Sequence, residues 1–336
     1  PFTLVHSGQH YDYEMSGKFF EDLELPSPDV NLNIRASTPS AQTAEVMAGV
    51  EGIIGETRPR LLLVQGDTNT TLGGGLAAVK SGVPVAHVEA GLRSNDFRMQ
   101  EEFNRRVVDH ISSYLFAPTN LSKRILRAEN VWGRVFVTGN TAIDACIQHA
   151  PMAARRSRII EALRFSEYAL ATVHRAENVD DREVLRDIAE SVMEAPVPVV
   201  IPIHPRTRKR LEEDGLWGSL STNGNVQVLP PMGYLDFLAL MMSCALIVTD
   251  SGGVVEEATA PSVRKRVLVL RPSTERPEAV RAGFAEVVGT DKRTIIARIG
   301  RALKERGALP RTSPYGSGDA ADRIAKALGS GDALGR

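Results

Sequence analysis

The amino-acid sequence predicts an α/β protein of two doubly wound domains, and three observations lead to this class. At 336 residues the chain is longer than one hydrophobic core usually supports. Short apolar runs alternate with helical patterns along its length, as in the strand–helix units of a parallel sheet. The alternation pauses in an arginine-rich bridge at residues 152–167 and then restarts. Because such sheets bind ligands at the carboxyl ends of their strands, we expect a binding cleft between the two domains.

The first domain is expected to cover residues 1–150. It opens as a strand in Pro1–Gly8 without a methionine, so either an initiator was removed or a preceding segment is absent. Further strands are predicted at Leu61–Gln65, Val83–Val88, Tyr114–Ala117 and Val135–Thr138. Helices are predicted at Thr70–Lys80, Glu101–Ser112, Asn120–Glu129 and Thr141–Ala150.

The second domain is expected to cover residues 151–313, where the same alternation returns. Its strands are predicted at Tyr168–Val173, Val197–Ile203, Val226–Leu229, Leu246–Thr249, Val267–Leu270 and Ala285–Val288. Its helices are predicted at Asp181–Glu194, Arg206–Glu213, Tyr234–Cys244, Val254–Thr259, Glu275–Ala282 and Asp291–Arg306. Residues 314–336 are expected to form a tail that begins as a turn and ends as an amphipathic helix.

The composition indicates a soluble protein with a small-molecule partner. The formal net charge is −1 and no long run of one sign occurs, which argues against nucleic acid or an anionic membrane as the main partner. Cys146 and Cys244 are the only cysteines, too few for a disulfide framework or a zinc site. The sequence has neither an apolar run that could span a bilayer nor a signal-peptide pattern. We therefore expect a cytoplasmic protein without a metal ion.

Acidic residues follow two predicted strands of the first domain. Asp67 lies in the segment QGDTNT from Gln65, and Glu89 lies in HVEAGLR from His87. Both positions fall where an open α/β sheet builds its site. Two structural alternatives stay open: Asp67 could cap the next helix, and Glu89 could pair with Arg93, because an unpaired carboxylate is costly to bury.

A pair of glutamates opens a predicted helix in the segment QEEFNRR, residues 100–106. Glu101 and Glu102 lie in its first turn, where a role in a functional site is one interpretation. Acidic residues in a first turn often only complement the helix dipole, however. The pattern therefore leaves both roles open.

Two histidines occupy matching places at the ends of strands in the second domain. His174 begins the segment HRAEN, with Arg175 and Glu177 beside it, and His204 lies in IPIHP. A lone histidine is more often structural than catalytic. The position of His174 at a strand end beside charged residues nevertheless makes it a candidate for the site.

A glycine turn gives the clearest ligand signal, in the segment VTDSGGVVEEA at residues 248–258. Backbone N–H groups around Ser251, Gly252 and Gly253 can bind a phosphate, and Arg276 supplies positive charge. Glu257 cannot face phosphate, but a carboxylate suits the paired hydroxyls of a ribose. A nucleoside diphosphate satisfies both demands, whereas a plain helix start with glutamates that favour the dipole is the alternative.

Taken together and in order, these motifs resemble the non-hydrolysing UDP-N-acetylglucosamine 2-epimerases, and especially the archaeal-like branch of that family. The resemblance covers nearly the full length of the chain. Its segments read SGQHYDY from Ser7, QGDTNT from Gln65, HVEAGLRS from His87, EEFNR from Glu101, VTGNTAIDA from Val137, HRAEN from His174, IHPRT from Ile203, DSGG from Asp250, TERPEAV from Thr274 and VGTD from Val288.

The resemblance implies two Rossmann-like domains, as in GT-B glycosyltransferases, with UDP held mainly by the second. It implies UDP-N-acetylglucosamine as substrate, no cofactor, a homodimer and a role in cell-surface polysaccharide biosynthesis. Catalytic roles would fall on Asp67, Glu89, Glu101 and His174. Contacts with UDP would fall on His174, His204, Ser251, Gly252, Gly253, Glu257 and Arg276. Gln9 and His10 would match a regulatory site for a second UDP-sugar in bacterial members.

The resemblance also implies a route in which UDP leaves first, 2-acetamidoglucal forms, and UDP adds back after protonation from the other face. The chain departs from the family pattern in lacking a strand and a Gly-x-Arg-Pro loop before Phe2, in carrying Arg264 where a glycine is usual, and in having Gln100 in place of a proline. Three alternatives are a UDP-sugar glycosyltransferase of the same architecture, a hydrolysing epimerase, and a UDP-sugar-binding module without activity.

Overall fold

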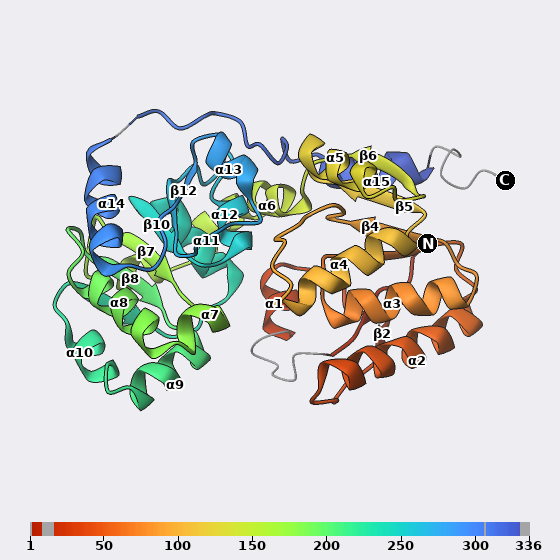
Figure 1. Cartoon of the computed structure of the whole chain (residues 1–336), viewed down its shortest axis with the longest axis horizontal. Helices are drawn as coiled ribbons and strands as arrows, with labels where there is room; N and C mark the ends of the chain where they lie inside the picture. Colours follow the sequence, from red (N-terminus) through yellow and green to blue (C-terminus); the bar gives the residue numbers. More distant parts are fainter. Residues whose placement is uncertain (1, 9–16, 306, 330–336) are drawn as a thin grey trace. The chain divides into compact units, whose positions relative to one another are not determined.

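The computed structural model describes residues 2–8, 17–305 and 307–329 and divides into two compact units (Figure 1). The first unit comprises residues 1–141 and 318–336, and the second comprises residues 142–317. The divisions thus lie at Thr141 and Ser317, whereas we expected them at residues 150 and 313. The regulatory candidates Gln9 and His10 lie outside the described residues.

The first unit contains two parallel sheets. In one, β1 (Val5–His6) pairs with β2 (Val30–Asn31). In the other, four strands lie in sequence order: β3 (Leu62–Gln65), β4 (Val85–Val88), β5 (Tyr114–Ala117) and β6 (Arg134–Val137). The helices of this unit are α1 (Gly17–Asp22), α2 (Pro39–Thr57), α3 (Asn69–Lys80), α4 (Gln100–Ile111), α5 (Asn120–Ala128) and α15 (Ala320–Gly329).

Helix α2 is an element that our sequence analysis did not predict. Thr38 caps its first turn, Pro39 occupies a position that needs no backbone donor, and the helix ends at Arg58 in the left-handed conformation. Its buried residues are Val46, Val50 and Ile54, spaced four apart on one face. They pack with β3, β4 and α3 in the core of the unit.

Helix α15 returns the C-terminal segment to the first unit. Ile324 is buried against Ala86, Val88 and Phe116 of the four-stranded sheet, and Leu328 packs beside it. The tail that we predicted at residues 314–336 therefore does contain a helix. That helix covers an apolar sheet face that would otherwise contact water.

The second unit contains one parallel sheet of six strands in the order β12-β11-β10-β7-β8-β9. The strands are β7 (Ala169–Thr172), β8 (Val199–Pro202), β9 (Val226–Leu229), β10 (Leu246–Thr249), β11 (Val267–Val269) and β12 (Ala285–Val287). The chain winds outward in both directions from the neighbours β7 and β10, so the switch point lies between these two strands. This is where a doubly wound sheet binds its ligand.

The helices of the second unit are α6 (Thr141–Arg156), α7 (Ala176–Val179), α8 (Arg182–Met193), α9 (Pro205–Glu213), α10 (Trp217–Thr222), α11 (Tyr234–Ser243), α12 (Gly252–Glu257), α13 (Pro277–Arg281) and α14 (Lys292–Lys304), with a 3₁₀ turn at Ile159–Ala162. They lie close to their predicted places, except that α7 and α10 were not predicted. Helix α6 continues past Pro151, where we expected it to end. Two arginines in its last turn favour the extension, because cations there complement the helix dipole.

None of the helices that the described residues form is long and apolar enough to cross a membrane. Within the same residues, no group of histidine, cysteine, aspartate and glutamate side chains could hold a metal ion.

Candidate active site

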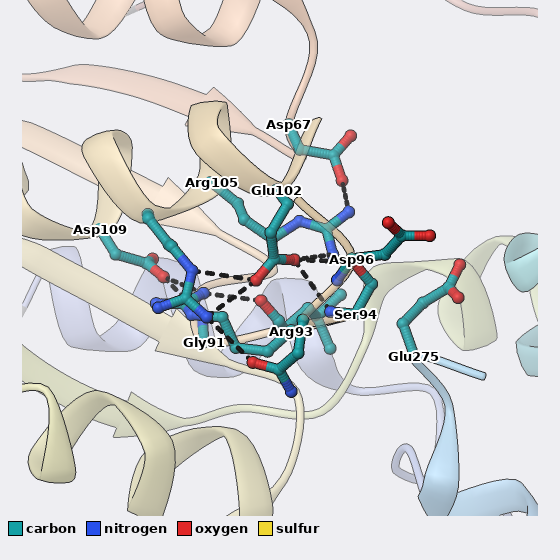
Figure 2. Close-up of polar contacts among 12 residues, drawn as sticks. Asp67, Gly91, Arg93, Ser94, Asp96, Glu102, Arg105, Asp109 and Glu275 are labelled. Carbon is teal, nitrogen blue, oxygen red and sulfur yellow. Dashed lines mark hydrogen bonds and ion pairs between the residues drawn. The ribbon is translucent and has the colours of Figure 1, made fainter. Parts of the chain in front are cut away.

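Asp67 follows β3, and its carboxylate is held by an arginine. Thr68 caps helix α3 by accepting the N–H of Thr71, so the alternative role of Asp67 as the cap is wrong. The Oδ2 of Asp67 instead contacts Nη2 of Arg105, a buried residue of α4 (Figure 2). Asp67 itself remains partly exposed, with 31% of its side chain open to solvent.

Glu89 follows β4 in a strained conformation. Its φ of +70° lies in the left-handed region, which is costly for a residue with a side chain. Its Oε1 accepts a hydrogen bond of 3.3 Å from Nδ2 of Asn140. The alternative pairing with Arg93 does not form, because Arg93 pairs with Asp109 and Glu129 instead.

The two glutamates that open α4 have different surroundings. Glu102 is fully buried, and its carboxylate accepts from the backbone and hydroxyl of Ser94 and contacts Arg105 and Arg106. Burial alone would raise the pKa of Glu102, but these hydrogen bonds and charges hold it below its usual value. Glu101 is partly exposed and, within the described part of the chain, accepts no hydrogen bond and forms no ion pair.

A buried ion network joins α4 to the loop that follows β4, and our sequence analysis missed it (Figure 2). Asp109 is fully buried; its Oδ2 lies 2.8 Å from Nη1 of Arg93 and accepts the N–H of Gly91 at 3.1 Å. Burial would lower the pKa of Arg93, but the carboxylates of Glu129 and Asp109 raise it above its usual value. The network fixes α4 against the loop that follows β4.

In the second unit, the glycine turn follows β10 at the switch point. Ser251 caps α12 by accepting from the N–H of Val254 at 3.5 Å. Gly252 is required by space, since a Cβ there would lie 2.6 Å from Oε1 of Glu275. Gly253 is exposed. The backbone of the turn can therefore approach a ligand closely, as a phosphate site needs.

In α12, as in α4, one glutamate of the pair is buried and the other is partly exposed. Glu256 is buried, and its Oε1 lies 2.5 Å from Nε of Arg276. Glu257 is partly exposed and accepts no hydrogen bond from the residues described here. Burial raises the pKa of Glu257 to about 7.

Cys146 and Tyr234 lie close enough to Glu257 to be influenced by its charge. The thiol of Cys146 lies 3.4 Å from the hydroxyl of Tyr234, and burial together with the charge of Glu257 raises the pKa of Cys146 to about 12. The same causes raise the pKa of Tyr234. A carboxylate in such surroundings gains strongly from a ligand that donates hydrogen bonds to it.

Three arginines gather around Glu275 beside the glycine turn. Nη1 of Arg271 lies 2.5 Å from one carboxylate oxygen, and Nη2 of Arg175 lies 3.5 Å from the other. Burial alone would raise the pKa of Glu275, but Arg276, Arg271 and Arg175 hold it below its usual value. From the sequence we named Arg276 as a ligand contact and noted Arg175 beside His174, but we missed Arg271.

His174 is placed by the loop that follows β7. Asp250 is fully buried and accepts the backbone N–H groups of His174 at 3.0 Å and Arg175 at 2.9 Å. The ring of His174 is partly exposed and lies 5.7 Å from the ring of His204, centroid to centroid. Burial, followed by the charges of His174 and Arg206, lowers the pKa of His204.

The sequence of the chain matches the family described as UDP-N-acetylglucosamine 2-epimerase over residues 1–329. The chain belongs to this family. A UDP-N-acetylglucosamine 2-epimerase of Methanocaldococcus jannaschii is 41% identical over 334 residues, which cover 97% of this chain and 90% of that protein. A UDP-2,3-diacetamido-2,3-dideoxy-D-glucuronate 2-epimerase of Pseudomonas aeruginosa is 38% identical over 335 residues, with coverage of 97% and 90%.

Solved structures of the UDP-N-acetylglucosamine 2-epimerase family match the fold as well. The M. jannaschii enzyme in complex with UDP-GlcNAc and UDP has a TM-score of 0.89 at 41% identity, covering 97% of this chain and 91% of that one. The Neisseria meningitidis enzyme bound to UDP-GlcNAc has a TM-score of 0.85 at 34% identity, covering 95% and 89%. The expected α/β class, with parallel sheets and a GT-B-like fold, is confirmed.

Proposed function

We propose that this member of the family interconverts UDP-N-acetylglucosamine and UDP-N-acetylmannosamine at C2 of the sugar. The observation that carries the proposal is the set of three carboxylates at or near the carboxyl ends of β3 and β4 and at the start of α4. Asp67, Glu89 and Glu101 all keep exposed surface, whereas the buried neighbours Glu102 and Asp109 are held by arginines. Acid–base chemistry needs carboxylates that a substrate can reach.

The second unit supplies groups suited to UDP. In the proposal, the diphosphate contacts the N–H groups at Ser251, Gly252 and Gly253, together with Arg276. Glu257 accepts hydrogen bonds from the ribose hydroxyls. His174 and His204 complete the set as further UDP contacts, and His174 also takes part in catalysis. The short contact between Glu256 and Arg276 supports this division, because it holds the guanidinium in place before a ligand binds.

The proposed reaction is an elimination followed by an addition. The C1–O bond breaks and its electron pair leaves with UDP, while a carboxylate takes the proton from C2. The product of this step is 2-acetamidoglucal. A proton then adds to C2 from the opposite face, and the UDP oxygen reforms its bond to C1. Two proton-transfer groups are thus needed, each worth roughly 10²–10⁴-fold in rate.

We assign the proton transfers to Asp67, Glu89 and Glu101 of the first unit. Asp67 suits the role of base because its carboxylate keeps exposed surface and is held in place by Arg105. Glu89 has only an amide as its described partner, and Glu101 has none among the described side chains. These two carboxylates suit a proton transfer in either direction.

The test is incubation of the chain with UDP-N-acetylglucosamine in heavy water, followed by NMR of the sugar. We expect deuterium at C2 in both epimers. Release of UDP without deuterium in the nucleotide sugar would contradict the epimerase proposal and favour a glycosyltransferase or a hydrolysing enzyme. Binding of UDP with neither release nor exchange would identify a binding module.

A parallel incubation addresses the choice of substrate. The P. aeruginosa relative is named for a diacetamido glucuronate, so this UDP-sugar is the control substrate. We expect faster exchange at C2 of UDP-N-acetylglucosamine. Faster exchange with the diacetamido sugar would keep the reaction type and change the substrate.

A further inference from the structure

We propose that His87 is a buried imidazolium that positions the catalytic carboxylates of the first unit. His87 lies on β4 and is fully buried. Its Nδ1 lies 2.8 Å from Oδ1 of Asp109 on α4. Its Nε2 lies 2.8 Å from the carbonyl oxygen of Gly66, the residue that directly precedes Asp67. One ring therefore joins the end of β3 to α4.

Both contacts of the ring require a donor on the histidine side. The carbonyl of Gly66 can only accept a hydrogen bond. Asp109 also acts as an acceptor, because its second oxygen receives the N–H of Gly91 and lies 2.8 Å from Nη1 of Arg93. A neutral imidazole carries one N–H, so one of the two contacts would place two acceptors face to face away from water. The doubly protonated ring satisfies both.

The charges linked to the ring favour the same state. The connected carboxylates are those of Asp67, Glu102, Asp109 and Glu129. The connected guanidinium groups are those of Arg93, Arg105 and Arg106. His110 lies at the solvent edge of the cluster, 3.9 Å from Glu129. A cationic His87 balances the four carboxylates, whereas a neutral ring would leave an excess of negative charge in a largely buried cluster.

This arrangement sets the geometry of two candidate catalytic groups. Asp67 follows Gly66, and Glu89 lies two residues beyond His87. Gly66 has a φ of +76°, and a Cβ added to it would lie 3.5 Å from Oε2 of Glu89, so the two strand ends are close together. Loss of the charge on the ring would break one of its two contacts, and with it the link between the end of β3 and α4. A shift of about 1 Å in such a group can lower turnover roughly 100-fold.

The charge of His87 can be measured directly by nitrogen NMR on the full chain labelled with [¹⁵N]histidine. The resonances of His87 are those that persist when each of the other six histidines is replaced by glutamine in turn. We expect both ring nitrogens of His87 to bear a proton in the folded chain. One ring nitrogen with the shift of an unprotonated imidazole would overturn the proposal.

The positioning role, which rests on the proposed function, is tested with His87→Gln. We expect kcat for epimerisation to fall roughly 100-fold while the Kd for UDP stays within about threefold. His110→Gln, which replaces an exposed histidine of the same unit, should keep parental kcat. A folded His87→Gln variant with parental kcat would contradict the positioning role. If His87→Gln does not fold, or if the parent does not epimerise, the nitrogen spectrum of the parent still decides the charge of the ring.

Discussion

The two units each carry a pair of adjacent glutamates within a helix, and the members of each pair have opposite surroundings. In the first unit, Glu102 is buried against two arginines and Ser94, whereas Glu101 is partly exposed without a partner among the described residues. In the second unit, Glu256 is buried against Arg276, whereas Glu257 is partly exposed. The buried member is the second glutamate in one pair and the first in the other.

In each pair, two neighbouring glutamates with identical side chains differ in burial and in the partners of their carboxylates. The buried carboxylate forms an ion pair with at least one arginine and is closed off from solvent, so a substrate cannot readily reach it. The other carboxylate keeps its acceptor capacity. We infer that Glu102 and Glu256 position other side chains and that Glu101 and Glu257 contact the ligand.

The largest effect is expected on turnover from the carboxylates of the first unit. Asp67→Asn and Glu89→Gln nearly preserve shape but remove a proton-transfer group, so each should lower the rate of epimerisation by roughly 10²–10⁴-fold. UDP affinity should stay within a few-fold, because we assign UDP to the second unit. Rate measurements together with calorimetry of UDP binding check both expectations. Parental turnover in both variants would remove the basis of the carboxylate mechanism.

The next largest effect is a difference in the free energy of unfolding between variants of the two glutamates of the first unit. Glu102→Gln leaves Arg105 and Arg106 without a charged partner at this position, and it should lower the free energy of unfolding by about 3 kcal/mol. Glu101→Gln changes a partly exposed group and should stay within about 0.5 kcal/mol of the parent. Urea unfolding of both variants measures the difference. Equal losses would show that the two carboxylates do not differ as proposed.

In the second unit, the partly exposed Glu257 should make the free energy of unfolding depend on pH. Burial raises the pKa of Glu257 from 4.5 in the unfolded chain to about 7 in the folded chain. Below pH 4.5 the carboxyl group is neutral in both states and does not affect the free energy of unfolding. As the pH rises from 4.5 to about 7, the group ionises more readily in the unfolded chain, so the free energy of unfolding falls. Glu257→Gln should therefore be more stable than the parent at about pH 8, by up to about 3 kcal/mol.

That advantage of Glu257→Gln should vanish as the pH falls to 4.5, the pKa of Glu257 in the unfolded chain. Thermal unfolding of both proteins across this range measures it. An advantage that stays constant with pH would show that the ionisation of Glu257 is not its source.

The smallest effect concerns what each glutamate of the second unit binds. Glu257→Ala should weaken UDP binding by roughly 1–3 kcal/mol through the lost ribose contacts. It should leave the affinity for inorganic pyrophosphate unchanged, because that ligand has no ribose. Glu256→Gln should weaken both ligands, since Arg276 loses its fixed position. Calorimetry with the two ligands would contradict the assignment if Glu257→Ala weakened both equally.

Most elements of the fold could be predicted because strand–helix alternation is a local pattern. Every strand predicted after the first domain's opening segment is present, with ends shifted by at most a few residues. Helix α2 was missed although its signal was available, since Val46, Val50 and Ile54 recur at a helical spacing. The tail helix was predicted, but its packing against the first unit was not. That packing depends on which sheet face is left uncovered by other helices, and this is not a local property of the sequence.

The candidate site could be predicted only as a set of segments. Neighbouring glutamates give the same local signal, so their sequence does not tell which one is buried. That difference comes from partners distant along the chain: Arg105 for Asp67, Asp109 for His87, and Arg276 for Glu256. Such pairs arise from tertiary packing, and single-sequence patterns do not report it.

The most direct test of the proposed division is deuterium exchange at C2 of UDP-N-acetylglucosamine by Glu101→Gln, measured by NMR in heavy water beside the parent. Our account predicts exchange by the parent and a loss of roughly 10²-fold or more in the variant, with UDP affinity within a few-fold and stability unchanged. Exchange by Glu101→Gln at the parental rate would contradict the claim that the partly exposed glutamate of the first pair acts on the sugar.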